Sequence, residues 1–175
     1  GVDLVVQAGD LRMDRNMWLY SSPASALESA RVLSGLHAPL GGWSVLGNHG
    51  WQDCNLARDS SGARNSVIEA FEEFDLHLLE NRSVKLDHGG SDIHLVGLGS
   101  LMGPRFDRPA GQKGHDDLAA AFHEVPAGAT SLLLAHEPDI FARHDGPDAL
   151  QISGHTHGGQ ITFWGWRPVV PSDYG

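Results

Sequence analysis

Four short apolar runs in this sequence each stop at a glycine or at a residue with a polar side chain. The four junctions are DLVVQA-GD at residues 3–10, WSVL-GNH at residues 43–49, SLLLA-H at residues 131–136 and LQIS-GHTH at residues 150–157. Short apolar runs that end at turn residues are typical of buried strands. The carboxyl ends of strands in α/β sheets line the crevice where ligands bind, so the polar residues of the junctions are expected to meet there.

The rest of the chain alternates helical patterns with further strands. Helices are predicted over residues 22–36, 65–74, 116–122 and 138–144, and further strands over residues 76–79, 84–86, 93–98 and 160–164. Ser22 and Pro23 are expected to begin the first helix as its N-cap and its first-turn proline. This alternation predicts an α/β fold. Residues 1–175 contain no linker-like stretch and no internal repeat, so a single domain is expected.

The composition excludes several kinds of protein. The formal net charge of −10 at pH 7 argues against general nucleic-acid binding through a basic face. Cys54 is the only cysteine, which excludes an internal disulfide and a zinc cluster of thiolates. No apolar run reaches the roughly 18 residues that a membrane-spanning helix needs. An acidic chain that binds anions needs a local source of positive charge, and bound metal ions supply one.

The polar residues at the four junctions form a mixed set of metal ligands. One carboxylate, one amide and three imidazoles make up this set: Asp10, Asn48, His136, His155 and His157. Mixed oxygen and nitrogen ligands suit Mn, Fe, Zn or Co better than Ca or Mg. Each junction alone also fits an ordinary turn, since Asp, Asn and Gly are common turn residues. The two imidazoles of GHTHGG have few structural reasons to be there, and the four junctions together favour a metal site.

The order GD, GNH, H and GHTH, with the phrases LLLAHEPDIF and LQISGHTHGGQ, resembles the calcineurin-like metallophosphoesterase superfamily and, within it, a bacterial phosphodiesterase-like branch. The resemblance runs through nearly the whole chain. It implies a four-layer α/β/β/α sandwich with two divalent metal ions (Mn, Fe, Zn or Co). It also implies hydrolysis of small anionic phosphoesters, with diesters favoured, by a metal-bridged hydroxide that attacks phosphorus in line.

The resemblance also implies a role for each junction residue. Asp10 would bridge the two metal ions, which lie about 3.5–4 Å apart in such sites. Asn48, His136 and His155 would bind the second ion, and His157 would bind the first. A purely structural zinc site is excluded, because such sites prefer four closed ligands rich in cysteine.

His49 follows a predicted ligand and, by the same resemblance, would lie beside the scissile phosphate as a proton donor or a phosphate clamp. Two neighbouring positions depart from the family pattern. Gly50 stands where an acidic residue is usual, and the acidic residue after GD is displaced to Asp14, which could still orient the His49 ring. A catalytically impaired binding scaffold with the same fold is therefore the alternative to an enzyme.

The opening Asp-x-His motif of the family is not found before Gly9-Asp10. Two look-alikes, Asp75-Leu76-His77 and Asp92-Ile93-His94, precede an apolar run instead of following it, so their side chains would lie at the wrong end of the sheet. The chain is therefore expected to be a fragment that lacks a first strand and helix, and to bind one metal ion well and the second poorly. Membrane association through the missing N-terminus stays open, as does a cytoplasmic or membrane-associated location.

The remaining histidines and the tryptophans are given structural interpretations. His37 is expected to cap a nearby helix end through a favourable interaction with the helix dipole. Four further histidines are interpreted as solvated: His88, His115, His123 and His144. Trp43, Trp164 and Trp166 are interpreted as packing residues rather than as a platform for a substrate.

Overall fold

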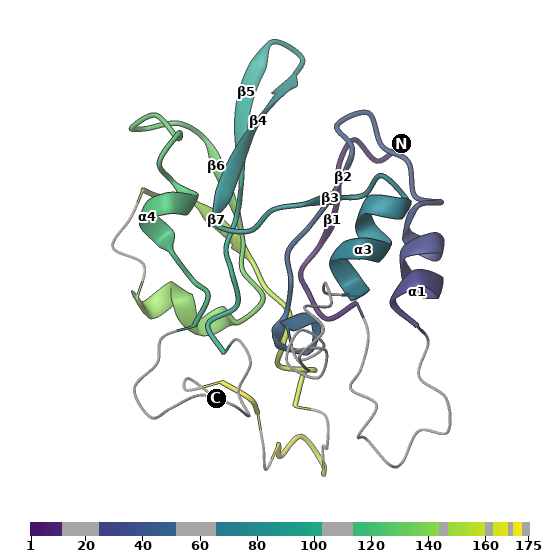
Figure 1. The fold of residues 1–175 in the computed structure, drawn as a ribbon. Coiled ribbons are helices and arrows are strands. Elements are labelled where there is room, and N and C mark those ends of the chain that lie inside the picture. The colour runs from purple at the N-terminus through teal and green to yellow at the C-terminus, as the bar shows by residue number, and fades with distance from the viewer. Residues whose placement is uncertain are drawn as a thin grey trace, which may run out of the picture.

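Two β-sheets pack face to face in the computed structural model, and helices cover the outer face of each sheet (Figure 1). The structure describes residues 1–11, 25–51, 66–102, 114–143, 147–159, 163–167 and 170–172. The layers follow the order helix, sheet, sheet, helix. The predicted α/β class and its arrangement of two sheets flanked by helices are confirmed.

The four junction strands lie in two parallel pairs, one pair in each sheet. The first sheet contains the parallel strands β1 (Val5–Gln7), β2 (Gly42–Ser44) and β3 (His77–Leu78), in that order. The second sheet contains, in order, β4 (Arg82–His88), β5 (Ser91–Gly97), β6 (Ser131–Leu134) and β7 (Leu150–Ile152). β4 and β5 form an antiparallel hairpin, whereas β5, β6 and β7 run parallel.

Helices cover both sheets. α1 (Ala26–Leu33) and α3 (Ser66–Glu73) lie on the first sheet, and α4 (Leu118–Ala121) and the 3-10 helix η1 (Pro138–Arg143) lie on the second. The apolar faces of α1 and α3 pack with the end of β2 in one buried cluster: Ala26, Ala30, Leu46, Val67, Ala70 and Phe71. Among the described residues, no helix is both long enough and apolar enough to cross a membrane.

The core between the sheets explains why the junction strands read as unbroken apolar runs. Val45 and Leu79 from the first sheet contact Leu95 and Leu134 from the second. Side chains alternate along a strand, so Leu133 points the other way, into the cluster under α4 and η1. Strands that are buried on both faces have few positions for polar residues.

α1 begins three residues later than predicted. Ser25, not Ser22, is its N-cap: the Ser25 hydroxyl accepts from Glu28 N at 3.1 Å, and Glu28 Oε2 accepts from Ser25 N at 2.8 Å. This reciprocal capping box satisfies two backbone donors. A start at Ser22 would place Ser25 at the position where the box needs Glu or Gln. Ser22 and Pro23 themselves lie outside the described residues.

Most of the other predicted elements occur near their predicted places, but their bounds differ: β4 and β5 are longer than the strands predicted over residues 84–86 and 93–98, and several other elements are shorter. The strand predicted to end at residue 46 ends at Ser44, and the helix predicted over residues 116–122 forms a single turn after the N-cap Asp117. Only the end of the strand predicted over residues 160–164 falls on described residues. There, Phe163 forms an isolated antiparallel bridge with Trp166.

Candidate metal centre

The carboxyl ends of β1, β2, β6 and β7 meet at one edge of the two sheets, in the lower part of Figure 1. His136 Nδ1 lies 2.6 Å from the Ala8 carbonyl oxygen, which joins the second sheet to the first. Within the second sheet, Gly154 N donates to the His136 carbonyl at 3.0 Å. The residues that follow the four strands are therefore neighbours in space.

Four side chains from these junctions bring their donor atoms together. His136 Nε2 lies 3.0 Å from Asp10 Oδ2 and 3.2 Å from Asn48 Oδ1. His155 Nδ1 lies 3.0 Å from the same Asn48 oxygen and 3.2 Å from His136 Nε2. Ligand atoms that bind one ion at about 2.1 Å lie about 3.0 Å apart when their bonds meet at right angles. These four residues, the donor cluster, therefore have the spacing and chemistry that fit a divalent transition-metal ion.

A hydrogen bond to the backbone of the first sheet orients the His136 ring. Its Nδ1–H donates to the Ala8 carbonyl, so Nε2 is the ring atom that faces the other donors. Burial lowers the pKa of His136, but the hydrogen bond and the negative charge of Asp10 raise it more, so the net shift is upward. The position attracts positive charge, and a metal ion would compete with the proton for Nε2.

Asp10 uses its two carboxylate oxygens in different directions. Oδ2 faces His136, while Oδ1 accepts from the His49 N–H at 2.9 Å. Burial raises the pKa of Asp10, but the hydrogen bond and charge of His136, together with His49, lower it more. Asp10 is therefore an ionised carboxylate in a half-buried position.

His155 is suited to bind a metal ion as a neutral ring. Burial lowers the pKa of His155, and the neighbouring charge of His136 lowers it further. The two rings meet edge to face, with their centroids 5.0 Å apart. Neutral imidazole is the form of histidine that ligates metals.

The glycines of the GD and GNH motifs allow the two strand ends to approach each other. A Cβ on Gly9 would meet the His136 ring and, at 2.8 Å, the Gly47 nitrogen. A Cβ on Gly47 would meet the Asp10 carboxylate. The glycines are therefore required because any side chain there would occupy the space of the donor cluster.

Three residues of the predicted ligand set have a left-handed backbone. These are Asp10 (φ 54°), His155 (φ 67°) and His157 (φ 51°). This conformation is uncommon for residues other than glycine, and it clusters at functional sites because only the surrounding structure holds it. In the sequence, only the glycines beside these residues point to this conformation.

His157 and His49 lie near the donor cluster without joining it. His157 belongs to the same loop as His155, but it is exposed. Among the described residues, the side chains whose ligand atoms lie close enough to share a metal ion include Asp10 and His155 but not His157. The role of His157 as a ligand of a further ion stays a prediction. Asp14, proposed to orient His49, lies outside the described residues.

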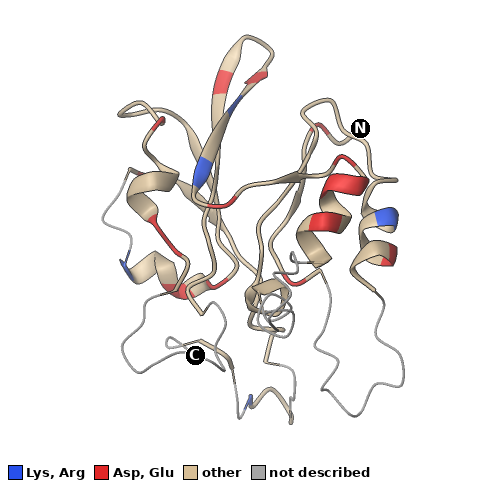
Figure 2. Ribbon diagram, in the orientation of Figure 1, with Lys and Arg blue, Asp and Glu red and all other residues tan. Residues whose placement is uncertain are grey.

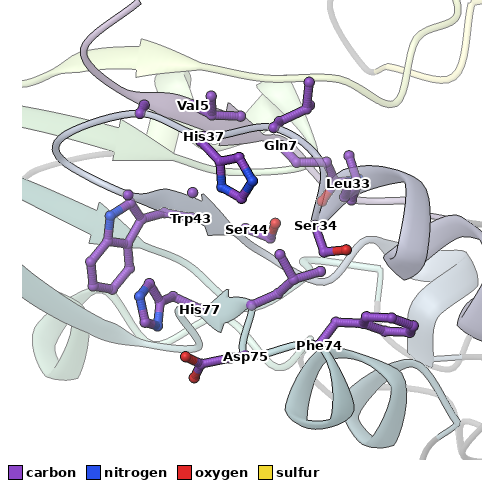
Figure 3. A pocket seen from close by; sticks show the side chains of 15 residues that line it. Val5, Gln7, Leu33, Ser34, His37, Trp43, Ser44, Phe74, Asp75 and His77 are labelled. Atoms are coloured by element: carbon purple, nitrogen blue, oxygen red, sulfur yellow. The ribbon is translucent and has the colours of Figure 1, made fainter.

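The Asp75/His77 look-alike lies at the opposite end of the first sheet. His77 begins β3, and its ring centroid lies 4.4 Å from that of Trp43. With Asp75, these residues line a pocket of about 280 Å³, shown in Figure 3. The other look-alike is at the start of β5, where Asp92 pairs with Lys85 at 3.0 Å. Neither pair joins the donor cluster, as the direction of the strands predicts.

Two buried acids near the strand ends were missed in the sequence. The Glu137 carboxylate accepts from the Ser100 hydroxyl at 2.5 Å and from Leu101 N at 3.0 Å. Glu80 Oε1 accepts from Leu46 N at 2.9 Å, and its Oε2 is buried without a hydrogen-bond partner among the described residues. Burial raises the pKa of Glu80 to about 8, against the effect of the Leu46 N–H and with the support of the Glu137 charge.

The interpretation of Trp164 and Trp166 as packing residues is wrong. Trp164 is fully exposed and Trp166 is 66% exposed, so neither is a packing residue. Trp43 is half-buried, as expected for one. His115 is exposed, as expected for a solvated position, and its ring also stacks on Trp51 with ring centroids 3.9 Å apart and planes inclined by 7°. His144 lies outside the described residues.

The similarity to known proteins agrees with this geometry. The sequence profile of one family, described as calcineurin-like phosphoesterase, matches residues 1–159. These residues include all four members of the donor cluster. No solved structure matches the fold significantly.

Three relatives illustrate the range of the similarity. The chain is 28% identical over 177 residues to the uncharacterized metallophosphoesterase YkuE of Bacillus subtilis, which covers 99% of this chain and 53% of that protein. It is 32% identical over 161 residues to the uncharacterized metallophosphoesterase Cj0846 of Campylobacter jejuni, a match that covers 91% of this chain and 36% of that protein. It is 28% identical over 169 residues to the UDP-2,3-diacylglucosamine pyrophosphatase LpxG of Chlamydia trachomatis, a match that covers 75% of this chain and 48% of that protein. The chain thus spans about half of these relatives or less.

Proposed function

The chain belongs to the calcineurin-like phosphoesterase family, and we propose that it hydrolyses phosphoester bonds in small anionic substrates with the help of divalent metal ions. The observation that carries this proposal is the donor cluster, in which one carboxylate, one amide and two imidazoles converge with separations of 3.0–3.2 Å. In an acidic chain with net charge −10, bound cations would supply the positive charge that a phosphate needs.

Asp10, Asn48, His136 and His155 would hold one ion, and His157 with Asp10 would hold a second ion more weakly. Bound ions of this kind act as Lewis acids and lower the pKa of bound water toward 7. His157 belongs to the same loop as His155, and its backbone is also left-handed. The mixed oxygen and nitrogen donor set favours Mn, Fe, Zn or Co.

His49 would act on the substrate rather than on the ion. Its backbone N–H donates to Asp10 Oδ1 at 2.9 Å, which holds the backbone of His49 beside the donor cluster. From there the imidazole could donate a hydrogen bond to a phosphoryl oxygen, or a proton to the leaving group.

Substrates with two organic groups on phosphate are favoured over phosphoproteins. The name of one relative, a UDP-2,3-diacylglucosamine pyrophosphatase, supports a small nucleotide-linked or diester-like substrate class. The natural substrate of this chain would therefore be sought among phosphodiesters and nucleotide sugars before phosphoproteins.

The test is hydrolysis of an aryl phosphodiester and an aryl phosphomonoester by the metal-free chain, to which Mn²⁺, Zn²⁺ or Co²⁺ is then added. Metal-dependent hydrolysis, faster for the diester and lost in His136→Ala, is expected. His123→Ala, a change at an exposed histidine next to α4, is the matched control and should behave as the wild type. A chain that binds metal but hydrolyses neither ester would be a binding scaffold.

A further inference from the structure

The segment after the glycine-rich loop forms a tight hairpin of aromatic residues. Phe163 N donates to Trp166 O at 2.9 Å, and Trp166 N donates to Phe163 O at 2.8 Å. Trp164 (φ 47°) and Gly165 (φ 86°) form the turn, and two left-handed residues in succession are typical of a type I′ hairpin turn. We call residues 163–167 the aromatic hairpin.

The aromatic side chains of this hairpin face solvent. Phe163 is 55% exposed, Trp164 is fully exposed and Trp166 is 66% exposed. Single exposed apolar residues are common, but three exposed aromatic residues within the four positions of one turn are a feature that marks an interaction site. The paired N–H and C=O groups of Phe163 and Trp166 would also remain satisfied if the tip left water.

The segment that contains the hairpin differs in charge from the rest of the sequence. Between residues 158 and 172, Arg167 is the only charged residue, although the chain has 22 acidic residues and a net charge of −10. Acidic residues gather elsewhere, for example along α3 (Figure 2). A segment with one arginine and no carboxylate carries no negative charge of its own that anionic headgroups would repel.

The hairpin is also fixed beside the donor cluster. The Arg167 side chain packs against Gly159, where an added Cβ would meet Arg167 Cδ at 2.6 Å. Gly159 closes the loop that carries His155 and His157. A surface that contacts the hairpin would therefore lie next to the candidate metal centre.

We propose that the aromatic hairpin docks this protein on a lipid surface, with Trp164 and Trp166 at the boundary between headgroups and acyl chains and Arg167 among the headgroup phosphates. Tryptophan is enriched at that boundary because its ring is apolar and its indole N–H is polar. Docking in this way brings the metal centre to phosphoesters at or near the lipid surface. The docking itself does not depend on hydrolysis.

The test is co-sedimentation of the metal-free chain with vesicles of phosphatidylcholine, alone or mixed with phosphatidylglycerol. The wild type is expected to bind both and to bind the mixed vesicles better. Trp164→Ala with Trp166→Ala should weaken binding about tenfold or more, since two large apolar side chains no longer leave water. Trp164→Phe should retain most of the binding. Arg167→Gln should remove the preference for the mixed vesicles.

The control is Phe141→Ala, which removes another exposed aromatic side chain, 77% exposed, from η1. It should bind vesicles as the wild type does. Because all the substituted side chains are exposed, thermal unfolding should be unchanged in each variant. Equal binding of the wild type and the double tryptophan variant would overturn the proposal. So would a double variant that loses only self-association, measured by sedimentation without lipid, because the hairpin would then be a contact between copies.

Discussion

The two ends of the first sheet carry similar residues but differ in what they can bind. At the carboxyl end, Asp10 and Asn48 meet His136 with donor atoms 3.0–3.2 Å apart. At the amino end, Asp75 and His77 line a pocket, and the His77 ring packs on Trp43 (Figure 3). A histidine and an aspartate near each other are therefore not enough to form a metal centre.

The difference comes from the direction of the strands and from the number of sheets that contribute. The donor cluster takes two residues from loops after the first sheet and two from loops after the second, so its side chains converge from opposite sides. The described lining of the pocket comes from the first sheet and its helices. Strand ends from two facing sheets can surround an ion, whereas side chains along one sheet lie side by side.

The largest expected effect is the loss of metal binding in His136→Ala. Its Nε2 contacts two other donors, and its Nδ1–H is held by the Ala8 carbonyl, so the change removes an oriented ligand. Metal affinity should fall at least about a hundredfold, since even indirect changes around a metal cost 10–100-fold. Titration calorimetry with Mn²⁺ or Zn²⁺ would measure it. His77→Ala, at the other end of the sheet, should leave the affinity unchanged; equal losses would remove the distinction between the two ends.

The next effect distinguishes the roles of two neighbouring residues, Asn48 and His49, at the carboxyl end of the sheet. His49→Ala should lower turnover of an aryl phosphodiester about 10²–10⁴-fold at unchanged metal content, as expected for a group that donates a proton or hydrogen bond to the substrate. Asn48→Ala should lower both turnover and metal content, because its Oδ1 lies within 3.2 Å of two imidazole nitrogens. Metal content measured on the same samples decides between the roles. A His49→Ala protein that loses its metal would reverse this assignment.

A smaller effect on stability and metal binding is expected when one of two glycines, in β2 or in the loop after it, is replaced by alanine. Gly47→Ala would place a Cβ against the Asp10 carboxylate and should cost about 1–3 kcal/mol of unfolding free energy, as overpacking does. It should also weaken metal binding, because Asp10 must move. Gly42→Ala is the matched control at the amino end of the strand, where a Cβ meets nothing within 4 Å and the backbone is not left-handed. Urea unfolding and metal titration of both variants would reveal a difference, and similar losses would contradict it.

The sequence predicted the donor cluster well because strand ends are governed by simple local patterns. DLVVQA-GD and SLLLA-H show an apolar run followed at once by a polar residue, and the structure brings Asp10 and His136 into contact. The bounds of α1 were harder to predict. Ser22-Pro23 and Ser25 with Glu28 are both acceptable helix starts, and the reciprocal bonds of the second decide between them.

Other features depend on contacts between residues far apart in the chain, which no local pattern contains. Glu80 lies in a predicted break between strands, yet its carboxyl group is buried against Leu46, 34 residues earlier. Trp164 was interpreted as a packing residue because of its size, but the turn at Trp164-Gly165 directs it into solvent. Burial depends on the whole fold, so residue type alone predicts it poorly at such positions.

The last expected effect is a pH dependence of stability that comes from Glu80, the buried acid that supports the end of β2 through Leu46 N. The pKa of Glu80 is raised from 4.5 to about 8 by burial, against the Leu46 hydrogen bond and the charge of Arg82 and with the charge of Glu137. Below pH 4.5 the folded and unfolded chains both keep the proton, so this group gives no pH dependence there. Between pH 4.5 and about 8 only the folded chain keeps it, so the free energy of unfolding should fall as pH rises, by up to about 1.4 kcal/mol per pH unit.

Glu80→Gln tests this directly, since glutamine keeps a carbonyl oxygen for the Leu46 N–H and carries no titratable proton. The variant should show a shallower fall in unfolding free energy between pH 5 and 8 than the wild type, measured by urea unfolding of the metal-free chain. Glu69→Gln, at an exposed position on α3, is the control and should keep the wild-type slope. If both variants keep that slope, Glu80 does not hold its proton in the folded chain. The support of the carboxyl end of β2 would then come from an ionised carboxylate.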